Sequence, residues 1–294
     1  MQPHSIPDNL KSWDIILAGI CVRMQAPADL EIGGNFLPFL REPAGDAYDV
    51  LLDVQPGAIP NSPGKGSWIG GVHYIRKLDE LWIFYHSHPQ QEPYGSVHIK
   101  ENRITLRYLP EAAKYFAGTT GIFNKVATEQ LLLERKTLVL HSALIQYRGR
   151  GIGFTGPCGI GKSTQADLWE KHLGARILNG DRAALKEEKN QWKGWGLPYA
   201  GSSGIYRNEA APLVVLVVLE QAEGNRIVRL TEQEALRCLF PELAIHRWDS
   251  RSVDLALTLL ADLLVKVPVY RLCCRPDADA VMLLKNTLEQ ENRL

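Results

Sequence analysis

The fold is decided by residues 156–164, which read Gly156-Pro157-Cys158-Gly159-Ile160-Gly161-Lys162-Ser163-Thr164. This run fits G-x-x-x-x-G-K-[ST], the pattern of loops that bind nucleotide phosphates. Glycines let such a loop curl inward, so that its backbone N–H groups surround an anion. An apolar, strand-like run precedes the loop at residues 152–155, and a helical pattern follows it at residues 163–173. Because the motif has both flanks that it requires, we expect residues 156–164 to bind a nucleotide.

Two side chains of this stretch have expected roles. Lys162 carries a point charge that can reach the β- and γ-phosphates, and we expect its side chain to face solvent rather than the core. Ser163 offers a hydroxyl to Mg²⁺, which prefers oxygen ligands. The helix that begins at Lys162 directs the positive end of its dipole at the phosphates. The expected cofactors are therefore ATP and Mg²⁺, although the loop alone does not select the base.

The residues before the loop narrow the class of protein. An apolar run at 137–147 is joined to the run at 152–155 through Arg148-Gly149-Arg150-Gly151. A tight glycine turn between two apolar runs predicts an antiparallel hairpin that leads directly into the loop. Common nucleotide-binding proteins of this motif reach the loop from a helix or from the chain start. No NKxD motif for guanine recognition follows, which disfavours a GTPase.

The second half of the chain alternates strand and helix patterns, which is typical of an α/β fold. The expected strands are 137–147, 152–155, 175–179, 191–196, 213–219, 226–230 and 269–274. The expected helices are 163–173, ending at Gly174; 231–240, opened by a capping box of Thr231 and Glu234; 252–265; and one from Asp277.

The first half is rich in short β-like runs instead. These runs are 15–24, 67–77, 81–85, 97–100 and 104–108, with helices expected at 112–118 and 123–135. Glu101 and Asn102 form a hairpin turn between the last two runs. We therefore predict a β-rich N-terminal domain over residues 1–130 and a catalytic domain over residues 131–294.

Composition excludes several classes of partner. The chain has 294 residues with 33 basic and 33 acidic side chains, so its formal net charge is zero and nothing indicates nucleic-acid binding. No apolar run is long enough to span a membrane, and residues 1–13 do not resemble a signal peptide. The five cysteines are odd in number and form no C-x-x-C pair, which favours reduced thiols in the cytoplasm.

Several of these features together resemble the catalytic core of HPr kinase/phosphorylase. They are His141-Ser142-Ala143-Leu144-Ile145, the turn at 149–151, the loop at 156–163 and the run Arg176-Ile177-Leu178-Asn179-Gly180-Asp181-Arg182. The resemblance covers about residues 137–220 and is weaker to about 285. It implies the P-loop fold shared with phosphoenolpyruvate carboxykinase. The chain more closely resembles HPr-kinase-related proteins of bacterial peptide-modification gene clusters, some of which phosphorylate a serine of a precursor peptide.

The sequence departs from that family at three places. Gly180 stands where the first of two aspartates is expected, and Thr164 stands where a carboxylate follows the loop serine. The motif linked to the phosphorylase reaction is not recognisable, which argues against the reverse reaction. The first 130 residues do not match the family's regulatory domain.

The resemblance and the chemistry together single out candidate catalytic residues. Asp181 follows an apolar strand, where a carboxylate can accept the proton of a hydroxyl or hold Mg²⁺; a surface-turn role is the alternative. His141 corresponds to the family's histidine and is expected near the phosphates, with a packed core histidine as the alternative. Arg207 could neutralise a transferring phosphoryl group, and Glu209 could bind a metal, unless both are ordinary charges of a solvated loop.

Other polar groups are expected to be structural. Glu220 ends the apolar strand 213–219 but is expected not to hold the metal. The cluster 246–249 is expected to cap a helix. His86 and His88, with His98 nearby, lack a fourth ligand for a structural zinc.

We therefore expect a cytoplasmic, Mg²⁺-dependent kinase that transfers phosphate from ATP to a serine or threonine hydroxyl of a peptide or protein. A kinase for a small-molecule alcohol and a non-catalytic nucleotide-binding regulator or scaffold are the alternatives. No nucleic-acid or membrane partner is expected, and the sequence does not decide whether the chain forms a homo-oligomer.

Overall fold

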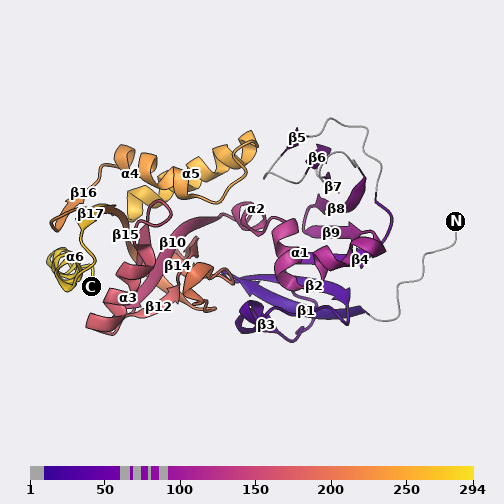
Figure 1. Cartoon of the computed structure of the whole chain (residues 1–294), viewed down its shortest axis with the longest axis horizontal. Coiled ribbons are helices and arrows are strands. Elements are labelled where there is room, and N and C mark those ends of the chain that lie inside the picture. Colours follow the sequence, from indigo (N-terminus) through magenta and orange to yellow (C-terminus); the bar gives the residue numbers. More distant parts are fainter. Residues whose placement is uncertain (1–9, 60–66, 69–73, 79–80, 86–91) are drawn as a thin grey trace. The chain divides into compact units, whose positions relative to one another are not determined.

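The structure is a computed structural model that describes residues 10–59, 67–68, 74–78, 81–85 and 92–294. The chain divides into two compact units, Met1–Thr128 and Glu129–Leu294. Figure 1 shows both units, the first dominated by strands and the second built of strands with helices on them. Each unit is described by itself.

The described part of unit 1 is built on one nine-stranded sheet of order β3-β1-β2-β4-β9-β8-β7-β6-β5. Its strands are β1 (Leu10–Leu17), β2 (Ile20–Pro27), β3 (Leu40–Arg41), β4 (Val50–Pro56), β5 (Ser67–Trp68), β6 (Tyr74–Leu78), β7 (Leu81–Tyr85), β8 (Pro93–Lys100) and β9 (Arg103–Tyr108). Three short helices accompany the sheet: η1 (Gly34–Phe39), η2 (Pro110–Phe116) and α1 (Thr119–Lys125). The hairpin predicted around Glu101 and Asn102 is confirmed, since β8 and β9 pair antiparallel on either side of these residues.

Two predicted elements of the first half are each split by backbone in the left-handed region. The run 15–24 was expected as one strand, but it belongs to β1 and β2, which turn at Ala18 (φ 48°) and Gly19 (φ 75°). The helix expected at 123–135 is interrupted at Ala127 (φ 51°), where α1 gives way to α2 (Thr128–Leu133). The spacing of apolar residues does not reveal where one residue adopts a positive φ, which explains why the strand and the helix were each predicted as one element.

Unit 2 contains two sheets that share their longest strands. Its strands are β10 (Thr137–Tyr147), β11 (Arg150–Thr155), β12 (Arg176–Asn179), β13 (Arg182–Glu188), β14 (Gln191–Gly196), β15 (Ala210–Gln221), β16 (Arg226–Arg229) and β17 (Val269–Cys274). One sheet runs β12-β10-β11-β15-β17-β16, and the other runs β10-β13-β14-β15. Because β10 and β15 belong to both sheets, the pairings of β10, β11, β15, β14 and β13 form a closed circuit.

The predicted hairpin before the glycine-rich loop is confirmed. β10 and β11 pair antiparallel from Ser142 and Thr155 to Tyr147 and Arg150. The two turn residues, Arg148 (φ 48°) and Gly149 (φ 76°), both have positive φ, as a two-residue turn of this handedness requires. β11 is parallel to β15, and β15 is parallel to β17, so the carboxyl ends of these strands lie at one edge of the sheet. Ligands of open α/β sheets bind at such an edge.

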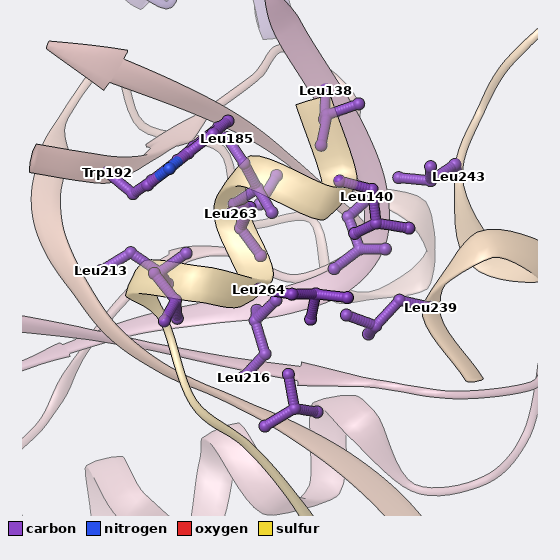
Figure 2. Close-up of a cluster of buried hydrophobic side chains, with 14 of the residues drawn as sticks. Leu138, Leu140, Leu185, Trp192, Leu213, Leu216, Leu239, Leu243, Leu263 and Leu264 are labelled. Carbon is purple, nitrogen blue, oxygen red and sulfur yellow. The ribbon is translucent and has the colours of Figure 1, made fainter. Parts of the chain in front are cut away.

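Helices cover the two faces of the sheet that contains β11. On one face, α3 (Lys162–Leu173) and α6 (Ala278–Gln290) pack on Val215, Val217 and Leu219 of β15. On the other face, α4 (Glu232–Leu239) and α5 (Ser250–Lys266) pack on Leu216 and Val218. This alternation explains why the whole run 213–219 is apolar. Figure 2 shows the second cluster, with Leu263 and Leu264 of α5 among strand side chains.

The helix boundaries follow the predicted end signals. α3 ends at Gly174 in the left-handed conformation (φ 66°). Thr231 and Glu234 form the expected capping box of α4, and the Asp277 side chain accepts a hydrogen bond from the Ala280 N–H at the start of α6. Among the described residues, no helix combines the length and apolar character that crossing a membrane requires.

Replacing Leu263 tests the packing of α5. Its side chain is fully buried, and a Leu→Ala change at such a site costs about 2–5 kcal/mol. Leu263→Ala should lower the local unfolding free energy by this amount, measured by hydrogen exchange of β10 and β15 amides. Val265→Ala on the same helix, where Val265 is 72% exposed, should change it by less than about 0.5 kcal/mol. Equal losses in both variants would contradict this assignment of the core.

Candidate functional site

The glycine-rich loop joins β11 to α3 at the carboxyl edge of the sheet. Gly159 (φ 79°) and Gly161 (φ 111°) lie in a conformation that favours glycine, and a Cβ at either position would meet nothing within 4 Å. Their backbone conformation rather than lack of space therefore accounts for these glycines. Gly161 is also the N-cap of α3, with no side chain bonded to the first turn of this helix. The loop thus leaves the positive end of α3 open to an anion.

Lys162 is buried, contrary to the expectation that it faces solvent. Its residue is 8% exposed, because Nζ donates hydrogen bonds back to the carbonyl oxygens of Gly156 (2.8 Å) and Pro157 (3.1 Å). Burial lowers the pKa of Lys162, and the negative charges of Glu242 and Asp181 oppose that shift. The ammonium group is therefore held inside the curl of the loop, where an anion bound by the loop would meet it.

Ser163 connects the loop to the turn that carries Asp181. Its hydroxyl lies 3.4 Å from the carbonyl oxygen of Gly180 and donates to it. The turn itself is organised by Asn179, the last residue of β12. The Asn179 Oδ1 accepts the N–H groups of Asp181 (2.8 Å) and Arg182 (2.7 Å).

Asn179 is fully buried, and the sequence analysis assigned it no role in the site. Its Nδ2 donates to the carbonyl oxygens of Leu197 (2.8 Å) and Tyr199 (2.9 Å), so the amide is bonded at both ends. Asn favours turns of this kind because its side chain bonds to the backbone two residues on. The signal in the sequence is an Asn that ends an apolar strand and directly precedes Gly-Asp.

The structure brings His141 and Asp181 together. His141 lies on β10, and its Nε2 is 3.6 Å from the Asp181 Oδ1. The backbone also joins the two places, since the Ser142 N–H donates to the Asp181 carbonyl (2.9 Å). On its other side, the Asp181 carboxylate lies 3.8 Å from the Arg182 Nε. Lys162, Ser163, His141 and Asp181 therefore belong to one site.

Glu242 is a further member that the sequence reasoning did not identify. It ends the short helix η4 (Phe240–Glu242), and its Oε2 lies 3.2 Å from the Nδ1 of His141. The Glu242 side chain is 13% exposed. Nothing local marks this residue, because its partner lies 101 positions away in the sequence.

Arg207 and Glu209 lie outside β12 and contact residues of that strand. The Arg207 Nε donates to the Ile177 carbonyl (2.9 Å), and its backbone N–H donates to the Leu178 carbonyl (3.0 Å). The Glu209 carboxylate accepts two hydrogen bonds from Arg176, of 2.6 and 2.8 Å, and they lower its pKa. Arg176 is the first residue of β12, whereas Asp181 follows the last. These contacts attach residues 207 and 209 to the strand and not to the glycine-rich loop.

Glu220 lies near the loop but points to another partner. Its side chain is 55% exposed, and its Oε2 is 3.7 Å from the Arg271 Nε. The next residue, Gln221, contacts the loop instead, with its Nε2 3.5 Å from the Gly159 carbonyl oxygen.

The single aspartate of the turn has a steric explanation. A Cβ at Gly180 would lie 2.0 Å from the Oγ and 2.5 Å from the Cβ of Ser203. At the neighbouring Gly201 (φ 53°), a Cβ would lie 2.9 Å from the Asp181 Cγ. The segment around 201–203 thus packs on the turn so closely that residue 180 has no room for a carboxylate side chain.

Among the described residues, no three His, Cys, Asp or Glu side chains are grouped to hold a metal ion. His86 and His88 lie outside the described residues, and His98 is exposed on β8. A Mg²⁺ ion needs few protein ligands where phosphates supply the others. The Ser163 hydroxyl and the Asp181 carboxylate, which is 28% exposed, are oxygen donors of that kind.

Comparisons with known proteins find similarity in structure but not in sequence. No family model matches it, and no curated protein matches it in sequence. Among solved structures, the Hpr(Ser) kinase/phosphatase from Coxiella burnetii is similar over 53% of this chain and 90% of that chain, with 17% identity and a TM-score of 0.31.

Restoring a carboxylate at residue 180 tests the steric explanation. Gly180→Asp should lower the unfolding free energy by about 1–3 kcal/mol, the usual cost of overpacking a tight site. Removing the obstructing side chain in Gly180→Asp/Ser203→Gly should recover most of that loss, and Ser203→Gly alone is the control. The measurement is calorimetric unfolding of each variant. A Gly180→Asp protein as stable as the unchanged chain would refute the explanation.

Proposed function

We propose that this chain is a phosphotransferase that uses ATP and Mg²⁺ to phosphorylate a hydroxyl group. The observation that carries the proposal is the meeting of a glycine-rich loop with a carboxylate at one sheet edge. The Ser163 hydroxyl bonds to Gly180, the residue directly before Asp181, so the expected phosphate site and the expected base are neighbours. Phosphoryl transfer depends chiefly on positioning and on electrostatic stabilisation, which such an arrangement provides.

The loop residues fit the phosphates of a nucleotide. The N-terminus of α3, which no side chain caps, presents backbone N–H groups. The Lys162 ammonium group supplies a positive charge, and it donates hydrogen bonds to two carbonyl oxygens of its own loop. Ser163 and Asp181 would hold Mg²⁺. When bound, Mg–ATP supplies the phosphoryl group that is transferred and neutralises part of its charge.

Asp181 is positioned to accept a proton from the acceptor. The Asn179 Oδ1 accepts the backbone N–H groups of Asp181 and of Arg182, which fixes the turn, and the Asp181 carboxylate is partly exposed, so an incoming hydroxyl can reach it. Transfer of the hydroxyl proton to Asp181 makes the acceptor oxygen a better nucleophile. His141 borders this carboxylate on the side of β10.

The acceptor class rests on the resemblance of residues 137–220 to HPr-kinase-related proteins, which favours a serine or threonine of a peptide or protein. A small-molecule alcohol is the second enzyme hypothesis. The two are separated by comparing transfer of labelled γ-phosphate to a peptide panel with transfer to free alcohols. Nucleotide binding without transfer to any acceptor would indicate a regulator or scaffold, for which the glycine at position 180, where the first of two aspartates is expected, is the favouring observation.

Lys162 variants test whether the loop binds the nucleotide. Lys162→Ala should weaken ATP binding at least about tenfold, or 1.4 kcal/mol, measured by titration calorimetry. Because Lys162 is buried, Lys162→Met keeps its bulk and separates lost charge from lost packing. Lys171→Ala, an exposed lysine on the same helix, is the matched control. Unchanged ATP affinity in both Lys162 variants would mean that this loop is not the nucleotide site.

Asp181→Asn tests the proposed base. Asn keeps the size of the side chain but cannot accept the proton, and general-base help is typically worth about 10²–10⁴ in rate. We expect kcat for phosphate transfer at saturating ATP to fall by this factor. A role confined to the metal would instead lower ATP affinity in Mg²⁺ and much less without it. Asp167→Asn, exposed on α3, serves as the control. A rate within a few-fold of the unchanged chain would remove Asp181 from the mechanism.

A further inference from the structure

Glu242 and His141 form a contact that the proposed function does not use. The Nδ1 of His141 lies 3.2 Å from the Glu242 Oε2, and the opposite ring nitrogen, Nε2, lies 3.6 Å from the Asp181 Oδ1. The imidazole ring is therefore placed between two carboxylates. These three side chains come from η4, from β10 and from the turn after β12, so their meeting is a product of the fold.

The segment that carries Glu242 is fastened to β10. The Ala244 N–H donates to the Val139 carbonyl (2.9 Å), and Leu243 forms a β-bridge with Leu140, the residue before His141. Through its Nη2, the Arg247 guanidinium donates to carbonyl oxygens on both sides of Glu242. These are the oxygens of Phe240 (3.3 Å), Pro241 (2.7 Å) and Leu243 (3.1 Å). Glu242 thus has a backbone held from two directions.

A carboxylate in this position needs a hydrogen-bond donor. The Glu242 side chain is 13% exposed, and burial of a carboxylate is costly unless it is hydrogen-bonded. An ionised carboxylate only accepts hydrogen bonds, so the contact places a proton on Nδ1 of His141. The hydrogen bond at one ring nitrogen decides the tautomer and therefore which nitrogen faces the other side.

We infer that Glu242 is a positioning residue, which fixes the tautomer and the orientation of His141 so that Nε2 is directed at Asp181. The inference rests on the proposed function, because it assigns the purpose of this orientation to the phosphotransfer site. Carboxylates that orient a metal-ligating histidine typically change affinity or activity about 10- to 100-fold when they are removed, and we expect an effect of the same size here. Glu242 does not touch the acceptor or the nucleotide in this role.

Two substitutions separate hydrogen bonding from bulk. Glu242→Leu replaces the carboxylate by an apolar side chain that cannot accept a hydrogen bond from Nδ1–H, so His141 should lose its fixed tautomer. Glu242→Gln keeps a carbonyl oxygen that accepts from Nδ1–H, so it should retain the tautomer in large part. The ¹⁵N chemical shifts and long-range ¹H couplings of the His141 ring report the tautomer directly, on the full chain without nucleotide. Glu232→Leu, an exposed residue of α4, is the matched control.

The activity arm uses the same variants. Glu242→Leu should lower kcat for phosphate transfer about 10- to 100-fold, with the KM for ATP and the ATP affinity unchanged, whereas Glu242→Gln should recover most of the loss. Arg247→Met, which releases the η4 carbonyls, should give a smaller loss of the same kind. A change confined to ATP affinity, or a loss not rescued by Gln, would overturn the positioning role.

The two arms keep this inference distinct from the proposed function. If the unchanged chain transfers no phosphate to any acceptor, the proposed function fails, whereas the ring spectra still decide whether Glu242 sets the tautomer. If the unchanged chain is active, and the Glu242→Leu variant has the same kcat and the same His141 ring spectrum as the unchanged chain, the inference alone fails.

Discussion

The site depends on the pairing of one strand, β10, which passes from one sheet to the other within its 11 residues. Residues 137–141 pair with β13, and residues 142–147 pair with β11. His141 is the last residue of the first segment, and the N–H of Ser142 bonds to the Asp181 carbonyl where the change occurs. A single long strand therefore brings the hairpin before the glycine-rich loop and the turn of Asp181 to the same place.

Hydrogen bonds from side chains to backbone carbonyl oxygens join the parts of the site. The Thr155 hydroxyl, at the end of β11, donates to the His141 carbonyl (2.9 Å), and Asn179 ties the Asp181 turn to residues 197 and 199. The loop glycines Gly159 and Gly161 are needed for their positive φ angles and not for close packing. The candidate catalytic side chains are therefore carried on backbone whose conformation is fixed, as preorganised sites require.

The sequence predicted the local features of unit 2 better than its long-range contacts. The turn at 148–149, the end of α3 at Gly174 and the capping box at Thr231 each depend on a few adjacent residues, and each was correct. The strand β13 was missed, because Lys186 and its two following glutamates obscure the apolar pattern of 183–185. The burial of Lys162 and the contact of Glu242 with His141 depend on residues that only the fold brings together.

The position of the carboxylates follows from how tightly the turn is packed. Ser203 occupies the space that a side chain at residue 180 would need, so a second acidic group cannot stand beside Asp181. A second carboxylate, that of Glu242 at the end of η4, contacts the Nδ1 of His141 instead. Two carboxylates 3 Å apart would repel each other and raise the pKa of one of them. Placing an imidazole between Asp181 and Glu242 keeps the two carboxylates apart while the site retains a second acidic residue.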